Sequence, residues 1–400
     1  MSRELAARGV VPPFQVMELV RASIARQRTH GDAIMLCVGQ PSTSAPRAVL
    51  DVVHEAIDTQ VLGYTESDGI PALREAIAGH YGSSYGLDVS ADDVLVTNGS
   101  SGGFSTLLLA AFQPGARIAM TRPGYPAYRN TVHALGCVPM DLLCGPESRF
   151  QPTVAMLEAL PERPDGLIIA SPANPTGTII DPGELARIAH WCQENDVLLI
   201  SDEIYHGISY GRECVTAWES SRESAVMGSV SKFHSMTGWR LGWSLLPPAL
   251  RQSMDLLQGN LSICAPAVSQ VGGVAAFSPQ AHVELSAHVQ RYARNREVLL
   301  RRLPELGITS FAPPDGAFYA YCDISHLTDD SLRWCHDTLN ATGVALAPGI
   351  DFDPVDGHHF MRLSFCGATT ALDEALDRLA AYVRTSAPHP PRSPSGGHHQ

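Results

Sequence analysis

The stretch Gly228-Ser-Val-Ser-Lys-Phe-His-Ser-Met-Thr-Gly-Trp-Arg-Leu-Gly-Trp243 contains Lys232, the only lysine of the 400-residue chain. All other basic residues among the 28 lysines and arginines are arginines. Arginine can replace lysine where a positive charge is needed, but a guanidinium does not form a Schiff base at physiological pH. Lys232, with Ser229 before it and Arg240 after it, therefore indicates covalent amine chemistry.

Six short apolar runs lie around this stretch, between about residues 70 and 250, and helical patterns separate them. Their length and near-continuous hydrophobicity predict strands that are buried on both faces of a mainly parallel sheet. The sequence therefore predicts an α/β fold, in which ligands gather beyond the carboxyl ends of the strands. The runs are 93–97, 117–120, 166–170, 196–201, 224–229 and 242–246.

The remainder of the chain predicts a second, smaller α+β domain at residues 281–385, after a large domain at residues 46–280. Its expected elements are a long amphipathic helix, a strand, a helix, a strand and a final helix. These lie at 280–302, 318–322, 331–342, 360–365 and 371–385. Residues 386–400 are rich in Pro, Gly and polar residues, and this composition predicts a disordered tail.

The composition disfavours several classes of protein. A net charge of −13 argues against nucleic acid or an anionic membrane as the main partner. No apolar run approaches the roughly 20 residues that span a bilayer, and the N-terminus lacks the apolar core of a signal peptide. Nine cysteines without a Cys-x-x-Cys pair argue against a zinc site or a disulfide scaffold. We expect a cytoplasmic enzyme.

Four motifs, in chain order, carry a family resemblance. They are Ser171-Pro-Ala-Asn-Pro-Thr-Gly177, Asp202-Glu-Ile-Tyr205, the Lys232 stretch and Met361-Arg-Leu-Ser-Phe365. Over roughly residues 12 to 385 the chain resembles the class I/II aminotransferases, which are fold type I enzymes that use pyridoxal 5'-phosphate (PLP). The resemblance implies an aspartate-aminotransferase-like fold, with a seven-stranded sheet flanked by helices and a small domain that residues 1–45 help to form.

A phosphate site is expected where Asn98-Gly-Ser-Ser-Gly-Gly103 follows a strand and precedes the helical run 104–112. Free backbone N–H groups and the helix dipole favour an anion at such a position. The resemblance makes Ser100 and Ser101 ligands of the PLP phosphate. By the same resemblance, Ser229, Arg240 and a tyrosine from the partner subunit, Tyr64, complete this site, so a homodimer is predicted.

The resemblance also assigns the remaining cofactor and substrate contacts. Tyr125 would stack on the pyridine ring, and Asp202 would keep the ring nitrogen protonated, which PLP needs as an electron sink. Asn174 and Tyr205 would contact the 3-oxygen. The substrate α-carboxylate would bind Arg362, with Asn174 and the backbone of Gly39 beside it; Lys232 would be the catalytic residue.

These residues predict a PLP-dependent aminotransferase that moves an amino group from an L-amino acid to a 2-oxo acid by a ping-pong mechanism. Two alternatives stay open. Another PLP-dependent reaction, such as β-elimination, racemisation, or cyclisation or oxidation in specialised metabolism, would use the same cofactor residues. A non-catalytic effector-binding module is disfavoured because no DNA-binding domain precedes the fold.

Substrate identity is left open by the sequence. No second arginine can be assigned to a distal carboxylate. Gln40 stands where many relatives have Glu, and Gly102-Gly103 where relatives carry larger residues. These departures bear on substrate preference and not on the cofactor.

Overall fold

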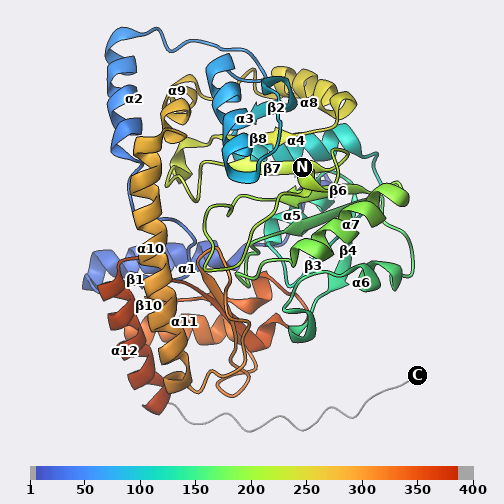
Figure 1. Cartoon of the computed structure of the whole chain (residues 1–400). Coiled ribbons are helices and arrows are strands. Elements are labelled where there is room, and N and C mark those ends of the chain that lie inside the picture. The colour runs from blue at the N-terminus through green and yellow to red at the C-terminus, as the bar shows by residue number, and fades with distance from the viewer. Residues whose placement is uncertain (1–5, 386–400) are drawn as a thin grey trace, which may run out of the picture.

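The computed structural model of the protein describes residues 6–385, and its main sheet has seven strands in the order β2-β8-β7-β6-β5-β3-β4 (Figure 1). β8 is antiparallel to β2 and β7, whereas all other neighbours are parallel. The predicted α/β fold class is confirmed. The strands are β2 (Val94–Thr97), β3 (Arg117–Arg122), β4 (Val138–Leu143), β5 (Gly166–Ala170), β6 (Leu198–Asp202), β7 (Ala225–Ser229) and β8 (Gly242–Leu245).

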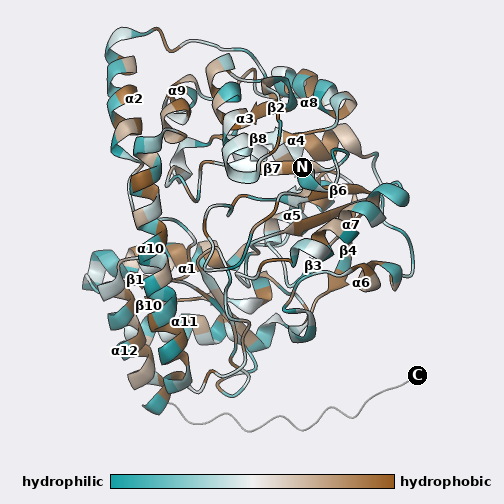
Figure 2. Ribbon diagram, viewed as in Figure 1, coloured by the Kyte–Doolittle hydropathy of each residue, from teal (hydrophilic) through white to brown (hydrophobic). Residues whose placement is uncertain are grey.

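Helices cover both faces of this sheet, because alternate side chains of each strand point to opposite faces. Leu167 and Ile169 of β5 pack toward α3, α7 and α9, and Ile168 between them packs toward α4, α5 and α8. Figure 2 shows the hydrophobic colour on the strands and mixed colours on the surrounding helices. These helices are α2 (Arg47–Thr59), α3 (Pro71–Tyr85), α4 (Gly99–Ala111), α5 (Pro126–Ala134), α6 (Val154–Glu158), α7 (Pro182–Glu194), α8 (Pro248–Leu261) and α9 (Ala267–Ala276).

The six predicted strands are confirmed, with ends that differ by up to two residues. β4 was not among the six runs. It is an edge strand that pairs only with β3, and most of its side chains are exposed or half-buried. Its residues Val138-Pro-Met-Asp-Leu-Leu143 therefore lack the continuous apolar pattern of strands that are buried on both faces.

The C-terminal part forms a three-stranded antiparallel sheet, β11-β12-β9, with helices around it. α10 matches the predicted long helix to within one residue, and α11 matches its prediction at both ends. The division into domains stays a prediction, and the predicted disordered tail lies outside the described residues. The elements are α10 (Pro279–Arg302), β9 (Tyr319–Asp323), α11 (Ser331–Thr342), β10 (Val344–Ala345), β11 (Ala347–Pro348), β12 (Phe360–Ser364) and α12 (Thr369–Thr385).

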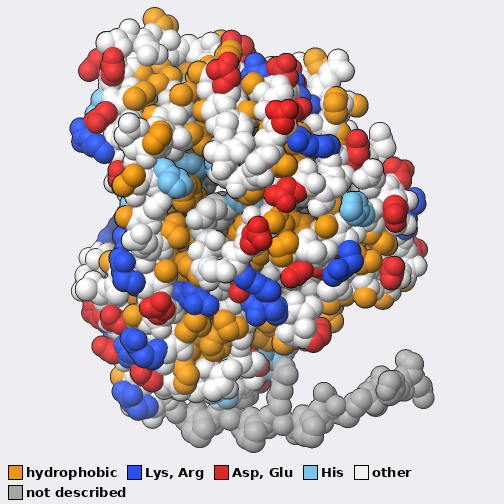
Figure 3. Space-filling view, viewed as in Figure 1, with side chains coloured by type: hydrophobic (Ala, Val, Ile, Leu, Met, Phe, Trp, Pro, Cys, Tyr) orange, Lys and Arg blue, Asp and Glu red, His pale blue; other side chains and the backbone are white. Residues whose placement is uncertain are grey.

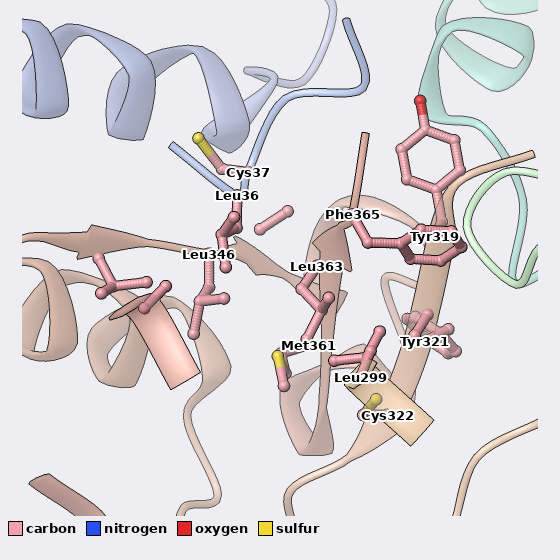
Figure 4. Packing of buried hydrophobic residues seen from close by; sticks show 14 of the residues in the cluster. Leu36, Cys37, Leu299, Tyr319, Tyr321, Cys322, Leu346, Met361, Leu363 and Phe365 are labelled. Atoms are coloured by element: carbon pink, nitrogen blue, oxygen red, sulfur yellow. The ribbon is translucent and has the colours of Figure 1, made fainter. Parts of the chain in front are cut away.

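The N-terminal segment packs onto this C-terminal part. β1 (Ile34–Met35) pairs in parallel with β10, and α1 (Gln15–His30) lies beside α11 and β11 (Figure 1). Figure 4 shows Leu36 and Cys37 close to Leu346 and Leu363 in one buried cluster. Each leucine that is fully buried in such a cluster contributes about 1.5–3 kcal/mol. This packing fixes the segment that leads to Gly39.

Within residues 6–385, no helix has the length and apolar character that crossing a membrane requires. The cytoplasmic location stays a prediction.

Candidate active site

A cavity of about 360 Å³ lies beyond the carboxyl ends of β5 and β6, between these strands and the C-terminal part. Its volume falls in the range of small-molecule sites. Ten of the twelve residues that the sequence singled out line this cavity. They are Gly39, Ser100, Ser101, Tyr125, Asn174, Asp202, Tyr205, Lys232, Arg240 and Arg362. Ser229 and Tyr64 do not.

Lys232 follows the end of β7 and reaches into the cavity, where its Nζ donates to the carbonyl oxygen of Gly39 at 2.8 Å. The amine also lies 5.7 Å from the ring centroid of Tyr205. Burial lowers the pKa of Lys232 to about 8, and the charge of Arg362 acts in the same direction. A substantial fraction of this amine is therefore neutral near physiological pH, as a nucleophile or a base requires.

Asp202 is the last residue of β6 and is 3% exposed. Its Oδ2 accepts a hydrogen bond from the hydroxyl of Tyr128, and its Oδ1 accepts one from the backbone N–H of Ile204 at 3.2 Å. Burial raises the pKa of Asp202 to about 6, although both hydrogen bonds oppose this rise. The carboxylate is thus largely ionised at neutral pH and faces the cavity without a salt-bridge partner among residues 6–385.

Arg362 lies in the middle of β12 and is 3% exposed. Its Nη1 donates to Oδ1 of Asn174 at 2.8 Å, and its Nη2 donates to the carbonyl oxygen of Cys37. The guanidinium carbon lies 4.4 Å from the ring centroid of Tyr319 and 4.6 Å from that of Phe352. No carboxylate pairs with it in the described part of the chain, so the buried charge is available to an anionic ligand.

The part of the cavity that Ser100 and Ser101 line lies at the start of α4. The helix begins at Gly99, earlier than the predicted 104, so Ser100 and Ser101 lie in its first turn. A Cβ on Gly99, whose φ is +66°, would lie 2.4 Å from Nη2 of Arg240, and the guanidinium therefore packs directly against the helix N-terminus. Arg240 itself has a φ of +53°. A helix N-terminus beside a guanidinium favours a phosphate.

Two predicted phosphate residues lie outside the cavity. The Oγ of Ser229 donates to the carbonyl oxygen of Leu241 at 3.1 Å and lies 2.8 Å from the Oγ of Ser231, which lines the cavity instead. Tyr64 lies between α2 and α3 and is 83% exposed. The roles assigned to these two residues stay predictions.

Two tyrosines of the site were not found from the sequence. Tyr128 lies one helical turn after Tyr125, and this spacing could have placed it on the same side of α5. The hydroxyl of Tyr319 lies 2.8 Å from that of Tyr205, and a Cβ on Gly39 would come within 1.5 Å of it. The segment 318–322 was predicted as a strand, but nothing in it distinguishes this tyrosine from Tyr321.

The sequence model of the family described as aminotransferase class I and II matches residues 31–379. The chain belongs to this family. Aminotransferases of classes I and II depend on PLP and transfer an amino group from an amino acid to a 2-oxo acid; the enzyme class predicted for this chain is thereby confirmed.

Relatives of known name support the membership over nearly the whole chain. A valine–pyruvate aminotransferase of Mycobacterium tuberculosis is 49% identical over 385 residues, which cover 96% of this chain and 99% of the relative. A crystal structure of an aminotransferase from the same organism superposes with a TM-score of 0.94 at 48% identity, covering 96% of this chain and all of that one. The structure of aspartate aminotransferase from Thermus thermophilus with maleate superposes with a TM-score of 0.89 at 28% identity. The match covers 95% of this chain and all of that one.

Proposed function

We propose that this aminotransferase binds PLP through Lys232 and transfers the amino group of a neutral L-amino acid with an apolar side chain to a small 2-oxo acid. The observation that carries the proposal is the position of Lys232. Its amine, with a pKa lowered to about 8, lies in a cavity that is lined by the buried carboxylate of Asp202 and the buried guanidinium of Arg362.

The donor and acceptor groups of the cavity fit PLP. Ser100, Ser101 and Arg240 would hold the phosphate at the start of α4, and Asp202 would hold the ring nitrogen in its protonated state. The ring of Tyr125 and the polar groups of Asn174 and Tyr205 would contact the pyridine, and Lys232 would bind the aldehyde. When bound, PLP supplies an electron-withdrawing ring and a carbonyl carbon that takes up the amino group.

Arg362 and Lys232 would then act on different groups of the substrate. Arg362 would bind the α-carboxylate of each substrate in turn, held flat by Tyr319 and Phe352. A fixed carboxylate would place the α-hydrogen within reach of Lys232, whose neutral amine can take up that proton. Both half-reactions would use these same two contacts, as a ping-pong mechanism requires.

The proposed preference for a substrate with an apolar side chain is based on the other residues that line the Lys232 cavity. Lys232, Arg240 and Arg362 are the only cations among the lining residues, and all three have roles above. A second substrate carboxylate would have no further cation to pair with among the lining residues in the described range 6–385. The N-terminal part of the chain contributes Phe14, Val16, Met17 and Val38 instead. The relative at 49% identity bears the name of an aminotransferase for valine and pyruvate.

The proposed active unit is a homodimer in which Tyr64 completes the partner's phosphate site. Support comes from the exposure of this tyrosine and of Val61, which are 83% and 97% exposed in the single chain. Exposed aromatic and aliphatic side chains in one short loop are typical of an interface.

The visible absorption spectrum of the purified protein, recorded with single L-amino acids and no oxo acid, tests the proposal. We expect a band from the lysine-bound cofactor that L-valine or L-alanine converts to the aminated form, with L-aspartate much less effective. Release of ammonia without conversion would favour an elimination reaction. Lys232→Arg keeps the charge and should lose the band and lower kcat by at least about 10⁴-fold, because covalent and general-base roles are lost together. Substantial turnover by this variant would overturn the assignment.

A further inference from the structure

A second cavity, of about 240 Å³, adjoins the first at the ends of β6 and β7. Ile204 lines both cavities, whereas Asp202 lines only the first and Glu203 only the second. Figure 3 shows histidine side chains bordering a hollow near the upper end of α10. His80, His206, His234 and His282 all line this second cavity. None of these residues takes part in the proposed reaction.

Glu203 is the buried acid of the second cavity and is 4% exposed. Its Oε1 accepts three hydrogen bonds, from the Oγ of Ser201 at 3.0 Å, the Oγ1 of Thr216 at 3.1 Å and the backbone N–H of Ala217 at 2.9 Å. Its Oε2 has no hydrogen-bond partner among residues 6–385, and the nearest basic nitrogen, Nδ1 of His206, is 3.6 Å away. A buried carboxylate oxygen without a donor is costly, and a ligand that donates to it would offset this cost.

The negative charge of Glu203 affects the pKa of residues that line the cavity. Burial raises the pKa of Tyr81, Tyr85 and Cys214, and the negative charge of Glu203 raises each of them further. Arg212 is the only arginine that lines the cavity; its side chain is 39% exposed and is directed to Asp315 at 3.5 Å. Above the pKa of Glu203, which burial raises to about 7, the interior of this cavity is therefore electronegative.

The histidines do not cancel this charge. Burial lowers the pKa of His80 and of His206 to about 4 and that of His234 to about 3. At neutral pH all three are uncharged, and Nδ1 of His80 and of His206 already lie within hydrogen-bond distance of hydroxyl groups, at 3.1 Å and 2.7 Å. Nδ1 of His234, a residue that is 4% exposed, has no hydrogen-bond partner in the described part of the chain. This nitrogen is a second buried acceptor at the cavity wall in the tautomer that carries its proton on Nε2.

Aromatic rings complete the lining, with Tyr81, Tyr85, Phe233 and Trp243 contributing. A cation is attracted to the faces of such rings, and more strongly where water is excluded. A metal ion is a poorer match, since no group of three or more histidine, cysteine or acidic side chains within residues 6–385 is arranged to hold one. The combination of an unpaired carboxylate oxygen, neutral imidazoles and aromatic walls suits an organic cation.

We propose that this second cavity is a binding site for a small, flat nitrogen cation of the guanidinium class, which donates N–H groups to Oε2 of Glu203. Such a cation is planar enough to lie against the rings, and its N–H groups can donate to Oε2, since Oε1 already accepts three hydrogen bonds. The site is separate from the cavity of Lys232, so the proposal does not depend on the reaction proposed above.

Ligand-observed NMR on the PLP-loaded protein at pH 8 tests this site, with methylguanidinium at low millimolar concentration as the probe. Saturation transferred from the protein to the methyl protons reports binding without reference to catalysis. Methylurea, which has nearly the same shape and no charge, is the matched control ligand. We expect methylguanidinium to bind at least tenfold more tightly than methylurea. Equal binding of the two would show that the positive charge is not recognised, and no transfer to either would show that neither ligand binds. Either result overturns the proposal.

A pair of variants locates the bound probe. Glu203→Gln should weaken methylguanidinium binding at least tenfold, whereas Glu194→Gln, the same change at an exposed position of α7, should leave it unaltered. Unchanged binding by Glu203→Gln would place the probe elsewhere and overturn the assignment. The comparison of the two ligands on the unaltered protein stands even where a variant fails to fold.

Discussion

The cavity of Lys232 and the cavity of Glu203 meet at the end of β6, yet they present opposite charges. Lys232, Arg240 and Arg362 line the first cavity against a single carboxylate, Asp202. The second cavity has the buried carboxylate of Glu203, and His80, His206 and His234 are uncharged at neutral pH. Two consecutive acids at the end of β6 face different cavities, because neighbouring side chains of an extended segment point to opposite sides. The difference in charge comes from the three cations that surround Asp202. A single strand end can therefore supply two unlike sites.

The largest expected effect comes from the same chemical change at these two neighbours. Asp202→Asn removes the only carboxylate that lines the Lys232 cavity, and we expect kcat to fall by about 10²–10³-fold, as when a preorganised charge is lost from a reaction centre. Glu203→Gln should leave kcat within about a factor of three, or about 0.7 kcal/mol. Steady-state rates with L-valine and a 2-oxo acid measure both. Equal losses would contradict the separation of the two cavities.

Arg362→Lys tests the positive charge of the first cavity. A lysine keeps the charge but cannot contact Asn174 and the Cys37 carbonyl through two planar N–H groups while it lies between two rings. We expect kcat/KM to fall about 10–100-fold, the equivalent of one charged hydrogen bond. Arg187→Lys, on the exposed side of α7, is the control and should have no effect. Wild-type kcat/KM in Arg362→Lys would refute the proposed carboxylate contact.

The pH dependence of the free energy of unfolding tests the negative charge of the second cavity. Burial raises the pKa of Glu203 to about 7, from an ordinary value of 4.5. Between these values the native protein keeps a proton that the unfolded chain has lost, so the free energy of unfolding falls as pH rises from about 4.5 to 7. Glu203→Gln should lack this fall, which we expect to amount to about 1–3 kcal/mol. Urea unfolding of both proteins at pH 5 and pH 8 measures it, and parallel pH profiles would contradict it.

The smallest expected effect is a shift in a pH profile. Tyr128→Phe removes a hydrogen bond that favours ionised Asp202, so the pKa of this carboxyl should rise further above about 6. The acid limb of kcat/KM should then move to higher pH by about one unit. Tyr85→Phe, the same change beside the second cavity, should leave the limb in place. An unmoved limb in Tyr128→Phe would show that Asp202 does not control it.

Much of the first cavity could be predicted from the sequence because its residues lie in short motifs that directly follow strands. Asn174, Asp202 and Lys232 were found in this way, and all three line one cavity. Tyr128 and Tyr319 were missed, since each is an ordinary aromatic residue whose partner is distant in the chain. Their contacts join residues 74 and 114 positions apart.

The second cavity could not be predicted from local patterns. Its histidines come from α3, from two loops and from the start of α10, at positions 80, 206, 234 and 282, and no spacing connects them. Glu203 was visible only as a neighbour of Asp202. β4 was missed for a related reason, because its stability comes from pairing with β3 and not from a continuous apolar run. Features that depend on tertiary contacts between distant segments leave a weak trace in the sequence.

The pairing of β1 with β10 has a consequence for the synthesis of the protein. Ile34 pairs with Val344, and Gly39 reaches Lys232 only once this N-terminal segment is in place. On a ribosome, residues up to 229 could pair the five strands from β7 to β4, whereas β2 must wait for β8. The segment that carries Gly39 must wait for residues near 344 and 362 to emerge. The nascent chain would therefore acquire most of its main sheet early, and Arg362 only as translation ends.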